Sequence, residues 1–351
     1  MSTMNSSPQR IPVVVLCGPT AAGKTALSLR LAERWPVEIV SADSRQVYRC
    51  LDIGTAKPTR EERAAVPHHL IDVVDPDEDF TVHDFVRLGR EAIAGIVERG
   101  RLPLLVGGTG LYIRALTGGL AAVPGGDEGL RKRLIAAEAA GGAGTLHRQL
   151  QVVDPLLAER LKPGDRLRIV RALEVYRLSG RRLSEFQAEH AFAESPYRLL
   201  VIGLTTARDE LYRRIDRRSE QMFTDGLLAE TANLLRQGYA RQLKSLRTIG
   251  YREAVRALDG ELSVAEALAL VQRESRRYAK RQLTWFGHLP EIIWVDSLRE
   301  SDRIPPLLES FMQPRRSGHG QDTFQYPGSI SQPSTQGAGA RNGSDDVGRK
   351  T

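Results

Sequence analysis

A glycine-rich run near the start of the chain has the residue types that hold phosphate. It fits the pattern G-x-x-x-x-G-K-[ST] and reads Gly18, Pro19, Thr20, Ala21, Ala22, Gly23, Lys24 and Thr25. In such a P-loop, backbone N–H groups between a strand and a helix point at phosphate oxygens, and the lysine adds positive charge. The threonine hydroxyl can help to hold Mg²⁺. The pattern specifies a diphosphate and leaves its organic part open.

A carboxylate, Asp43, follows the apolar run Val37–Ser41. If that run is a parallel strand, its carboxyl end faces the same ligand crevice as the P-loop. Asp43 is therefore a candidate metal ligand or general base, including a base for a substrate hydroxyl as in a kinase. The structural alternative is an aspartate that caps the next helix, and position alone leaves both open.

Arg218 lies on the apolar face of a predicted helix. Leu211, Ile215 and Met222 define that face, and Arg218 is three and four residues from its apolar neighbours. An arginine in this position either extends to solvent or meets an anion. In a chain with a P-loop, a phosphate is the candidate anion.

A later predicted helix carries a stripe of basic residues at the spacing that normally produces an apolar stripe. Its members are spaced i, i+3, i+4, i+7 and i+8, and they are Arg273, Arg276, Arg277, Lys280 and Arg281. Such a stripe is tolerable against a polyanion; the alternative is a solvated helix face, which usually mixes both signs. Further basic clusters at residues 131–133 and 166–171 favour a long nucleic acid over a mononucleotide.

The composition is that of a globular protein with a basic excess. Of 351 residues, 41% are hydrophobic and 26% are charged, and the net charge of +7 favours an anionic partner. The two cysteines, Cys17 and Cys50, cannot by themselves build a zinc cluster or a disulfide framework. No apolar run approaches the roughly 18 residues that span a bilayer. We therefore expect a cytoplasmic protein that does not bind a membrane.

Short apolar runs alternate with helical patterns along the first part of the chain. The predicted strands are Val13–Cys17, Val37–Ser41, His69–Val74 and Leu102–Val106. One helix is predicted over Ala26–Arg34, and a second begins at the capping-box pair Thr81 and Asp84. This alternation predicts an α/β fold, a P-loop NTPase-like parallel sheet flanked by helices.

The alternation stops after residue 120. Residues 121–197 contain no good strand candidate and are expected to form a helical insertion domain. Strands return at Tyr197–Leu204 and Ile292–Val295, with the helical stretch Arg208–Trp285 between them. The predicted organisation is a disordered N-terminus (1–11), a core in two parts (12–120 and 198–313) around the insertion, and a disordered tail (314–351).

The residues alone leave three classes of protein open. The chain could be an ATP-using phosphotransferase of the nucleoside-kinase type, or a transferase that acts on RNA and holds another diphosphate in its P-loop. It could also be a nucleic-acid-binding protein with a P-loop but no turnover. The long helical insertion and the basic stripe favour RNA.

Several motifs together resemble one family, the tRNA dimethylallyltransferases, also called tRNA isopentenyltransferases. They run in order along residues 12–296 and comprise the P-loop, Ser41–Tyr48, Leu51–Pro58, Pro67–Asp72, Leu105–Tyr112, Arg171–Val175, Gly250–Arg252 and Lys280–Trp285. The resemblance implies transfer of a dimethylallyl group from dimethylallyl diphosphate to N6 of adenosine 37 in tRNAs that read codons beginning with U. Diphosphate leaves. Relatives that prenylate free adenine nucleotides usually lack so large an insertion and rank second.

The resemblance also implies roles for particular residues. Asp43 matches the general base, Thr109 a residue close to the reacting adenine, and Arg218 a group that holds the diphosphate together with the P-loop. Thr25 would bind Mg²⁺. The expected partners are dimethylallyl diphosphate and the anticodon stem-loop of tRNA, clamped by the insertion, and a monomer is the expected state. Matching positions for tRNA contact are Asp43, Ser44, Arg45, Gln46, Thr109, Arg131, Leu167, Arg168, Ile169, Val170, Arg171, Arg247, Gly250, Tyr251, Arg252, Arg273, Arg276, Arg277, Lys280 and Arg281.

Overall fold

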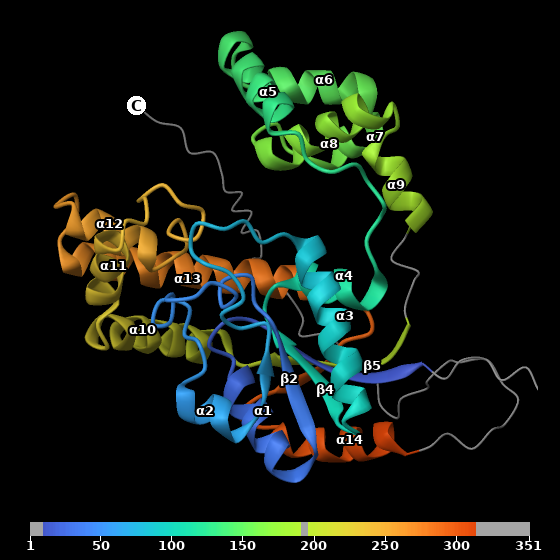
Figure 1. The fold of residues 1–351 in the computed structure, drawn as a ribbon, viewed down its shortest axis with the longest axis vertical. Helices are drawn as coiled ribbons and strands as arrows, with labels where there is room; N and C mark the ends of the chain where they lie inside the picture. Colours follow the sequence, from blue (N-terminus) through green and yellow to red (C-terminus); the bar gives the residue numbers. More distant parts are fainter. Residues whose placement is uncertain (1–9, 191–195, 314–351) are drawn as a thin grey trace, which may run out of the picture. The chain divides into compact units, whose positions relative to one another are not determined.

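The computed structural model describes residues 10–190 and 196–313, and the core of this part is one parallel sheet (Figure 1). Its six strands lie in the order β3-β2-β4-β1-β5-β6, and every neighbouring pair runs parallel. The strands are β1 (Ile11–Cys17), β2 (Val37–Ala42), β3 (His68–His69), β4 (Leu102–Gly107), β5 (Tyr197–Thr205) and β6 (Ile293–Asp296). The predicted α/β fold is confirmed. The carboxyl ends of β1, β2 and β4 meet at one edge of the sheet.

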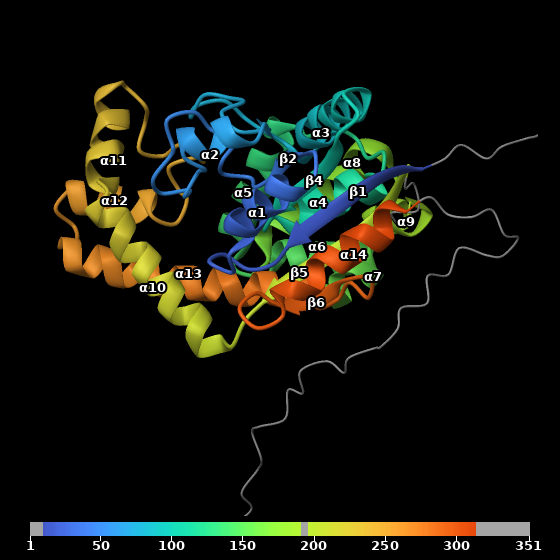
Figure 2. The same cartoon turned by 90° about the horizontal axis from the view of Figure 1, so that it is seen from below.

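The central strands are continuous apolar runs because helices cover both faces of the sheet. These helices are α1 (Lys24–Arg34), α3 (Val82–Glu98), α4 (Gly110–Gly118) and α14 (Ile304–Met312). Val13 and Val15 of β1 belong to the cluster with α3 and α4, whereas Val14 and Leu16 belong to the cluster with α1 and α14. Figure 2 shows α3 and α14 on opposite sides of the strands. The alternation of side chains along β1 thus divides the core into two layers.

The strand predicted at His69–Val74 is wrong beyond its first residue. Leu70 and Asp72 have positive φ values of 64° and 56°, which an extended strand cannot accommodate. The chain turns there, and Val74 then forms an isolated parallel bridge with Tyr48 in the loop after β2. Nothing in the side-chain pattern indicates this turn, because neither residue is a glycine.

The ends of the described chain also differ from expectation. Ile11 is the first residue of β1, so the segment expected to be disordered is at least one residue shorter than 1–11. Helix α14 was not predicted: Pro305 and Pro306 fall in its first turn, where a missing N–H removes no helical hydrogen bond. Residues 1–9 of the expected disordered N-terminus and the expected tail, 314–351, lie outside the described residues.

The segment between β4 and β5 folds into helices that share a hydrophobic cluster of their own. After α4 come α5 (Glu128–Gly141), α6 (Thr145–Val153), α7 (Pro155–Arg160), α8 (Arg166–Ser179) and α9 (Leu183–His190). Leu134 and Leu150 are at the centre of the cluster, with exposures of 1% and 0%. Glu174 is fully buried beside it; it accepts a hydrogen bond from the Asp127 N–H and pairs with Arg131 and Arg171. This glutamate joins the first and fourth helices of the insertion.

A second helical stretch follows β5 and includes the helix with the basic stripe. It consists of α10 (Arg208–Thr224), α11 (Leu227–Arg236), α12 (Tyr251–Leu258) and α13 (Val264–Phe286), with α10 packed against α13 and α11 against α12. Tyr251 ties this stretch to the loop after β2: its hydroxyl donates to Glu230 and accepts from the Gly54 N–H. A Cβ on Gly54 would lie 2.4 Å from the Tyr251 ring, so only glycine fits. In the described part of the chain, no helix has the length and apolar character to cross a membrane.

Candidate active site

The P-loop lies between β1 and α1, as its motif requires. Gly18 has a φ of 137°, and a Cβ there would lie 2.5 Å from the Leu204 carbonyl oxygen, so the first glycine cannot be replaced. Lys24 begins α1, and its Nζ donates to the backbone oxygens of Gly18 (3.0 Å) and Pro19 (2.7 Å). The ammonium group is therefore held over the loop, where a phosphate would meet it.

Arg218 reaches the P-loop from α10. Its Nη1 donates to the Thr20 hydroxyl at 3.2 Å. Within the described residues, neither Arg218 nor Lys24 has a carboxylate close enough to form an ion pair. Burial, together with the positive charge of Arg218, lowers the pKa of Lys24 to about 8, while the charge of Asp43 acts in the opposite direction. Two cations with no carboxylate partner favour an anion at this position.

Asp43 follows β2 at the same edge of the sheet. It lines a hollow together with Lys24, Thr25 and Gln46. Its Oδ1 accepts a hydrogen bond from the Arg45 N–H at 2.8 Å, so it closes a turn and does not cap a helix. Its Oδ2 has no hydrogen-bond partner among the described residues. That oxygen is available to a proton or a metal ion.

Thr109 connects the end of β4 with Asp43's loop and with α13. Its Oγ1 accepts a hydrogen bond from the Ser44 N–H at 3.1 Å, and a further hydrogen bond joins its side chain to Tyr278. Burial, together with the charge of Asp43, raises the pKa of Tyr278 to about 12, so this phenol stays neutral. Tyr278 was missed in the sequence because it lies inside the basic run. An aromatic residue among those cations is the feature of the sequence that could have pointed to Tyr278 as a site residue.

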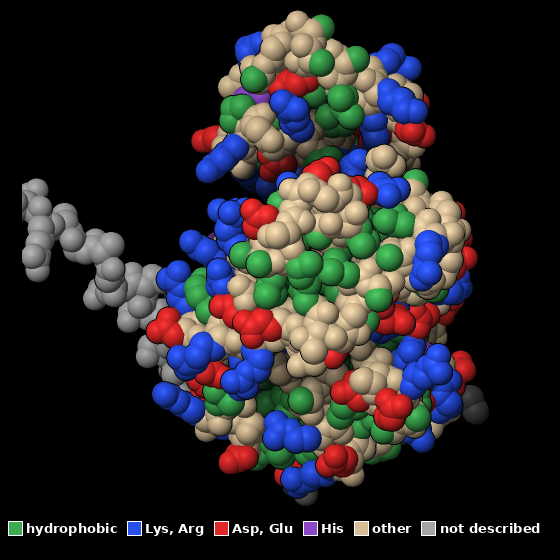
Figure 3. All heavy atoms as spheres, turned by 90° about the vertical axis from the view of Figure 1, so that its left-hand side faces the viewer, with side chains coloured by type: hydrophobic (Ala, Val, Ile, Leu, Met, Phe, Trp, Pro, Cys, Tyr) green, Lys and Arg blue, Asp and Glu red, His purple; other side chains and the backbone are tan. Residues whose placement is uncertain are grey.

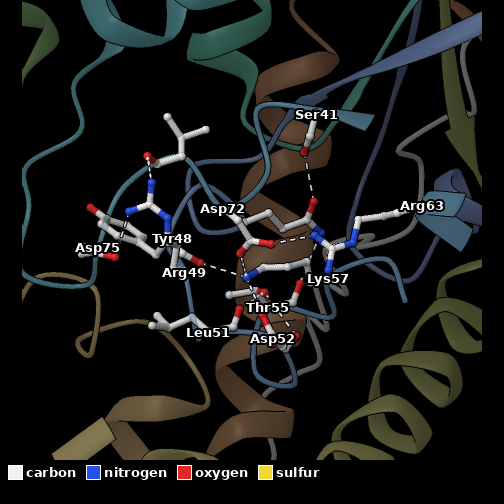
Figure 4. A network of polar contacts seen from close by, with 12 residues as sticks. Ser41, Tyr48, Arg49, Leu51, Asp52, Thr55, Lys57, Arg63, Asp72 and Asp75 are labelled. Atoms are coloured by element: carbon white, nitrogen blue, oxygen red, sulfur yellow. Dashed lines mark hydrogen bonds and ion pairs between the residues drawn. The ribbon is translucent and has the colours of Figure 1, made fainter. Parts of the chain in front are cut away.

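A buried lysine, Lys57, holds the loop that carries Gln46. Its side chain is 1% exposed, and its Nζ donates to Asp52 (2.5 Å), Asp72 (2.6 Å) and the Tyr48 carbonyl oxygen (2.9 Å). Figure 4 shows Lys57 between the two carboxylates, with Arg63 on the far side of Asp72. The loop closed by Lys57 places the Ala56 carbonyl oxygen 3.3 Å from the Gln46 amide nitrogen. Gln46 is thereby fixed in the hollow next to Asp43.

We expect Lys57→Met to lower the free energy of unfolding by about 3 kcal/mol, because it removes a buried cation together with its hydrogen bonds to Asp52, Asp72 and the Tyr48 carbonyl oxygen. Urea unfolding monitored by circular dichroism measures the change. Lys244→Met is the matched control: Lys244 forms an exposed pair with Asp79 at 3.6 Å, and its loss should cost less than about 1 kcal/mol. Equal losses in the two variants would contradict a special role for the buried lysine.

The basic stripe on α13 is partly neutralised by acidic neighbours. Arg276 pairs with an aspartate of α10, while Arg273 and Arg277 both pair with Glu274. Lys280 and Arg281 are exposed and form no ion pair within the described residues. Figure 3, which shows the face at the left-hand side of Figure 1, likewise has Lys and Arg side chains interspersed with Asp and Glu side chains. The stripe thus carries less free positive charge than its sequence predicts.

Several positions expected to contact tRNA are buried in the structure. Ile169 and Val170 are 1% and 7% exposed in the core of the insertion, and Tyr251 is fully buried under α11. Their side chains pack inside the helical layers and are not exposed in this conformation, so contact with tRNA at these positions stays a prediction. The backbone of Gly250 is buried as well.

The other expected contacts lie at the surface, and some already have a partner. Leu167 is 88% exposed at the start of α8. Arg168 next to it pairs with Asp165, and Arg252 pairs with Glu253. Arg131 and Arg171 are both held by Glu174. Arg45 and Arg247 are accessible and lie on separate elements. A continuous surface for tRNA would therefore combine exposed residues from several elements.

Comparison with known proteins gives consistent matches. The family model described as IPP transferase matches residues 46–289, and that described as isopentenyl transferase matches residues 11–71. The chain is 60% identical to tRNA dimethylallyltransferase 1 of Syntrophotalea carbinolica over 87% of this chain and 97% of that one. A crystal structure of the Bacillus halodurans tRNA isopentenylpyrophosphate transferase is 43% identical, with a TM-score of 0.62, and covers 86% of this chain and 97% of that one. A eukaryotic dimethylallyltransferase acting on tRNA is 26% identical, with a TM-score of 0.73, and covers 86% and 79%.

Proposed function

The chain belongs to the IPP transferase family, and from this membership we propose that it transfers a dimethylallyl group from dimethylallyl diphosphate to tRNA. Its activity is that of a tRNA dimethylallyltransferase. The acceptor we propose is N6 of adenosine 37, beside the anticodon of tRNAs that read codons beginning with U. One observation carries the proposal: two cations without carboxylate partners, Lys24 and Arg218, flank the P-loop, and Asp43 faces the same hollow.

At the donor end, the P-loop amides, Lys24 and Arg218 bind the diphosphate. The C1–O bond of the dimethylallyl group breaks as negative charge grows on the departing diphosphate. Cations placed beforehand in a partly buried site stabilise this charge more than water would. In this arrangement the P-loop stabilises a departing diphosphate and does not hold a phosphate that is itself transferred.

At the acceptor end, the N6 amino group forms the new C–N bond to C1 and must lose a proton. The adenine amine is a weak nucleophile because its lone pair is delocalised into the ring. Asp43 takes the proton through its free Oδ2, and general-base help of this kind is typically worth about 10²–10⁴ in rate. Thr109 and Tyr278 lie beside Asp43 and bound the space for the adenine, which must leave its stack to enter.

The residues around the P-loop fit a magnesium ion. Thr25, with a hydroxyl, and Asp43, with a carboxylate, both line the same hollow. No cluster of three or more His, Cys, Asp or Glu side chains suited to a metal occurs in the part of the chain that the structure describes. Mg²⁺ commonly takes one or two protein oxygens and completes its shell with phosphates and water, as this donor set allows. When bound, it would add positive charge at the leaving diphosphate.

The proposal extends to the setting of the reaction. We propose that the enzyme acts in the cytoplasm, where tRNA is available, and that it acts as a monomer. One chain carries the P-loop, Asp43 and Thr109, so a single copy supplies both ends of the site. The insertion is the proposed clamp on the anticodon stem-loop.

A labelling experiment tests the function. The protein is incubated with tRNA and labelled dimethylallyl diphosphate, with and without ATP, and the tRNA is digested to nucleosides. Label on N6 of adenosine in the absence of ATP is the expected result. Phosphate transfer from ATP, or prenylation of free AMP in preference to tRNA, would replace the proposal with a kinase or a nucleotide prenyltransferase.

The basic stripe gives a separate prediction about tRNA binding. Neutralising its two unpaired members with Lys280→Gln and Arg281→Gln should weaken tRNA binding and reduce the slope of log K against log salt by about 1–2. Fluorescence anisotropy at several salt concentrations measures the slope. The control is Arg87→Gln, which removes an exposed arginine that pairs with Glu91 on α3. An unchanged slope in the double variant would place the tRNA surface elsewhere.

A further inference from the structure

Gln282 is a buried side chain of α13 that joins two loops of the site. It is 6% exposed. Its Oε1 accepts a hydrogen bond from the backbone N–H of Thr20 in the P-loop at 2.9 Å, and its Nε2 donates to the backbone oxygen of Gly108 at 2.9 Å. A side-chain amide holds its acceptor and donor at a fixed separation. Both hydrogen bonds therefore form only when the two loops stand at one particular distance.

Each of the two loops leads directly to a group used in the reaction. Thr20 accepts a hydrogen bond from Arg218 through its side chain, so the P-loop residue held by Gln282 also orients the cation at the diphosphate. Gly108 is followed by Thr109, which bonds to the loop of Asp43 and to Tyr278. Gln282 is thus a direct polar link between the donor end and the acceptor end.

The close packing at Gly108 leaves little freedom in this link. A Cβ on Gly108 would lie 2.2 Å from the Gln282 amide nitrogen and 3.4 Å from the Gly18 carbonyl oxygen. The backbone of the acceptor loop therefore lies directly against both the amide and the P-loop. Another glutamine of the same helix, Gln272, provides a comparison: its hydrogen bonds to described residues go to α10, through the Asp216 carbonyl oxygen and Glu220.

We propose that Gln282 is a positioning residue for the transfer reaction: it sets the distance between the diphosphate held by the P-loop and the adenine beside Thr109. The inference rests on the proposed function, and it assigns a role in the reaction to a residue that touches neither substrate. Its effect falls on the chemical step, because misplacing reacting groups by about 1 Å can cost a hundredfold in rate. The tRNA-binding surface of α13 is on other residues and keeps its affinity.

The test is Gln282→Met, which keeps the length of the side chain and removes both hydrogen bonds. We expect kcat to fall by about 10–100-fold, with the KM for tRNA changed by less than about twofold. The expected change for Gln272→Met is less than about twofold in both constants. If Gln282→Met does not fold, Gln282→Glu carries the same test, since it keeps the acceptor for Thr20 and loses the donor for Gly108.

A double-mutant cycle with Thr109→Ala separates positioning from a general loss of stability. If Gln282 acts by placing the Thr109 loop, adding Gln282→Met to the Thr109→Ala variant should lower kcat only slightly. The same substitution in the wild-type enzyme should lower kcat much more. Multiplicative losses, or a wild-type kcat in Gln282→Met with only a lower melting temperature, would overturn the inference. The wild-type enzyme in the same assay reports separately on the proposed function: if it transfers no dimethylallyl group, that function fails.

Discussion

Asp43→Asn should lower kcat for dimethylallyl transfer by at least about a hundredfold while leaving the affinity for tRNA nearly unchanged. Asparagine has almost the shape of aspartate, and its Oδ1 can still accept the hydrogen bond from the Arg45 N–H, so the turn after β2 is retained. The lost function is at Oδ2, where an amide nitrogen cannot take a proton from N6 of adenosine. Single-turnover rates with prebound tRNA, together with filter-binding affinities, measure the two quantities independently.

Asp259→Asn is the matched control for Asp43. Asp259 pairs with Arg241 at the end of α12, away from the P-loop, and its replacement should change kcat by less than about twofold. If Asp43→Asn keeps more than about a tenth of wild-type turnover, the aspartate is not the base, and its role is limited to closing the turn. A large loss of tRNA affinity with little loss of kcat would instead make it a recognition residue.

The placement of the P-loop and of Arg218 could be predicted from the sequence because the signals are local. The P-loop motif fixes the strand and the helix on either side of it, and the apolar neighbours of Arg218 place that arginine on an inward face. Both features depend on spacing along one element, which periodicity reports directly. Asp43 was located by the rule that carboxyl ends of parallel strands meet at one edge.

The links between elements could not be predicted in the same way. Gln282 and Lys57 each join segments that are far apart in the chain, and nothing in the residues around them indicates a partner. Tyr251 illustrates a different limit: its place in a family motif suggests tRNA contact, and in the structure its hydroxyl bonds to Glu230 and to the Gly54 N–H. A motif records that a residue is required and does not say whether the requirement is chemical or structural.

Lys24→Met is expected to reduce kcat/KM for dimethylallyl diphosphate by about 10²–10³, because it removes a charge that acts on both the bound and the departing diphosphate. The methionine keeps most of the side-chain length, so α1 and the P-loop should still form. Lys24 donates only to backbone oxygens of its own loop, and no carboxylate in the described residues is left unpaired by its removal. A variant with wild-type kcat/KM would show that Arg218 and the loop amides suffice.

The pKa of Lys24 adds a dependence on pH with a definite sign. Burial lowers this pKa to about 8 in the free enzyme, with help from Arg218, so the ammonium form predominates below about pH 8 and is lost above it. A bound diphosphate favours the charged form and raises the pKa again. Affinity for the diphosphate should therefore be full below about pH 8 and fall as the pH rises, by up to about tenfold per unit.

Calorimetric titration with dimethylallyl thiolodiphosphate, in the absence of tRNA, measures this affinity between about pH 6.5 and 9.5 without turnover or ionisation of the RNA bases. Burial raises the pKa values of Cys17 and Tyr278 to about 12, so both stay neutral over this range. Lys24→Met should bind weakly, and the decline above pH 8 should be absent from it. The same decline in wild type and variant would assign the titration to another group, and a flat wild-type profile would mean that Lys24 keeps its charge throughout. A decline confined to the wild type identifies the ammonium group of Lys24 as the charge that recruits the diphosphate.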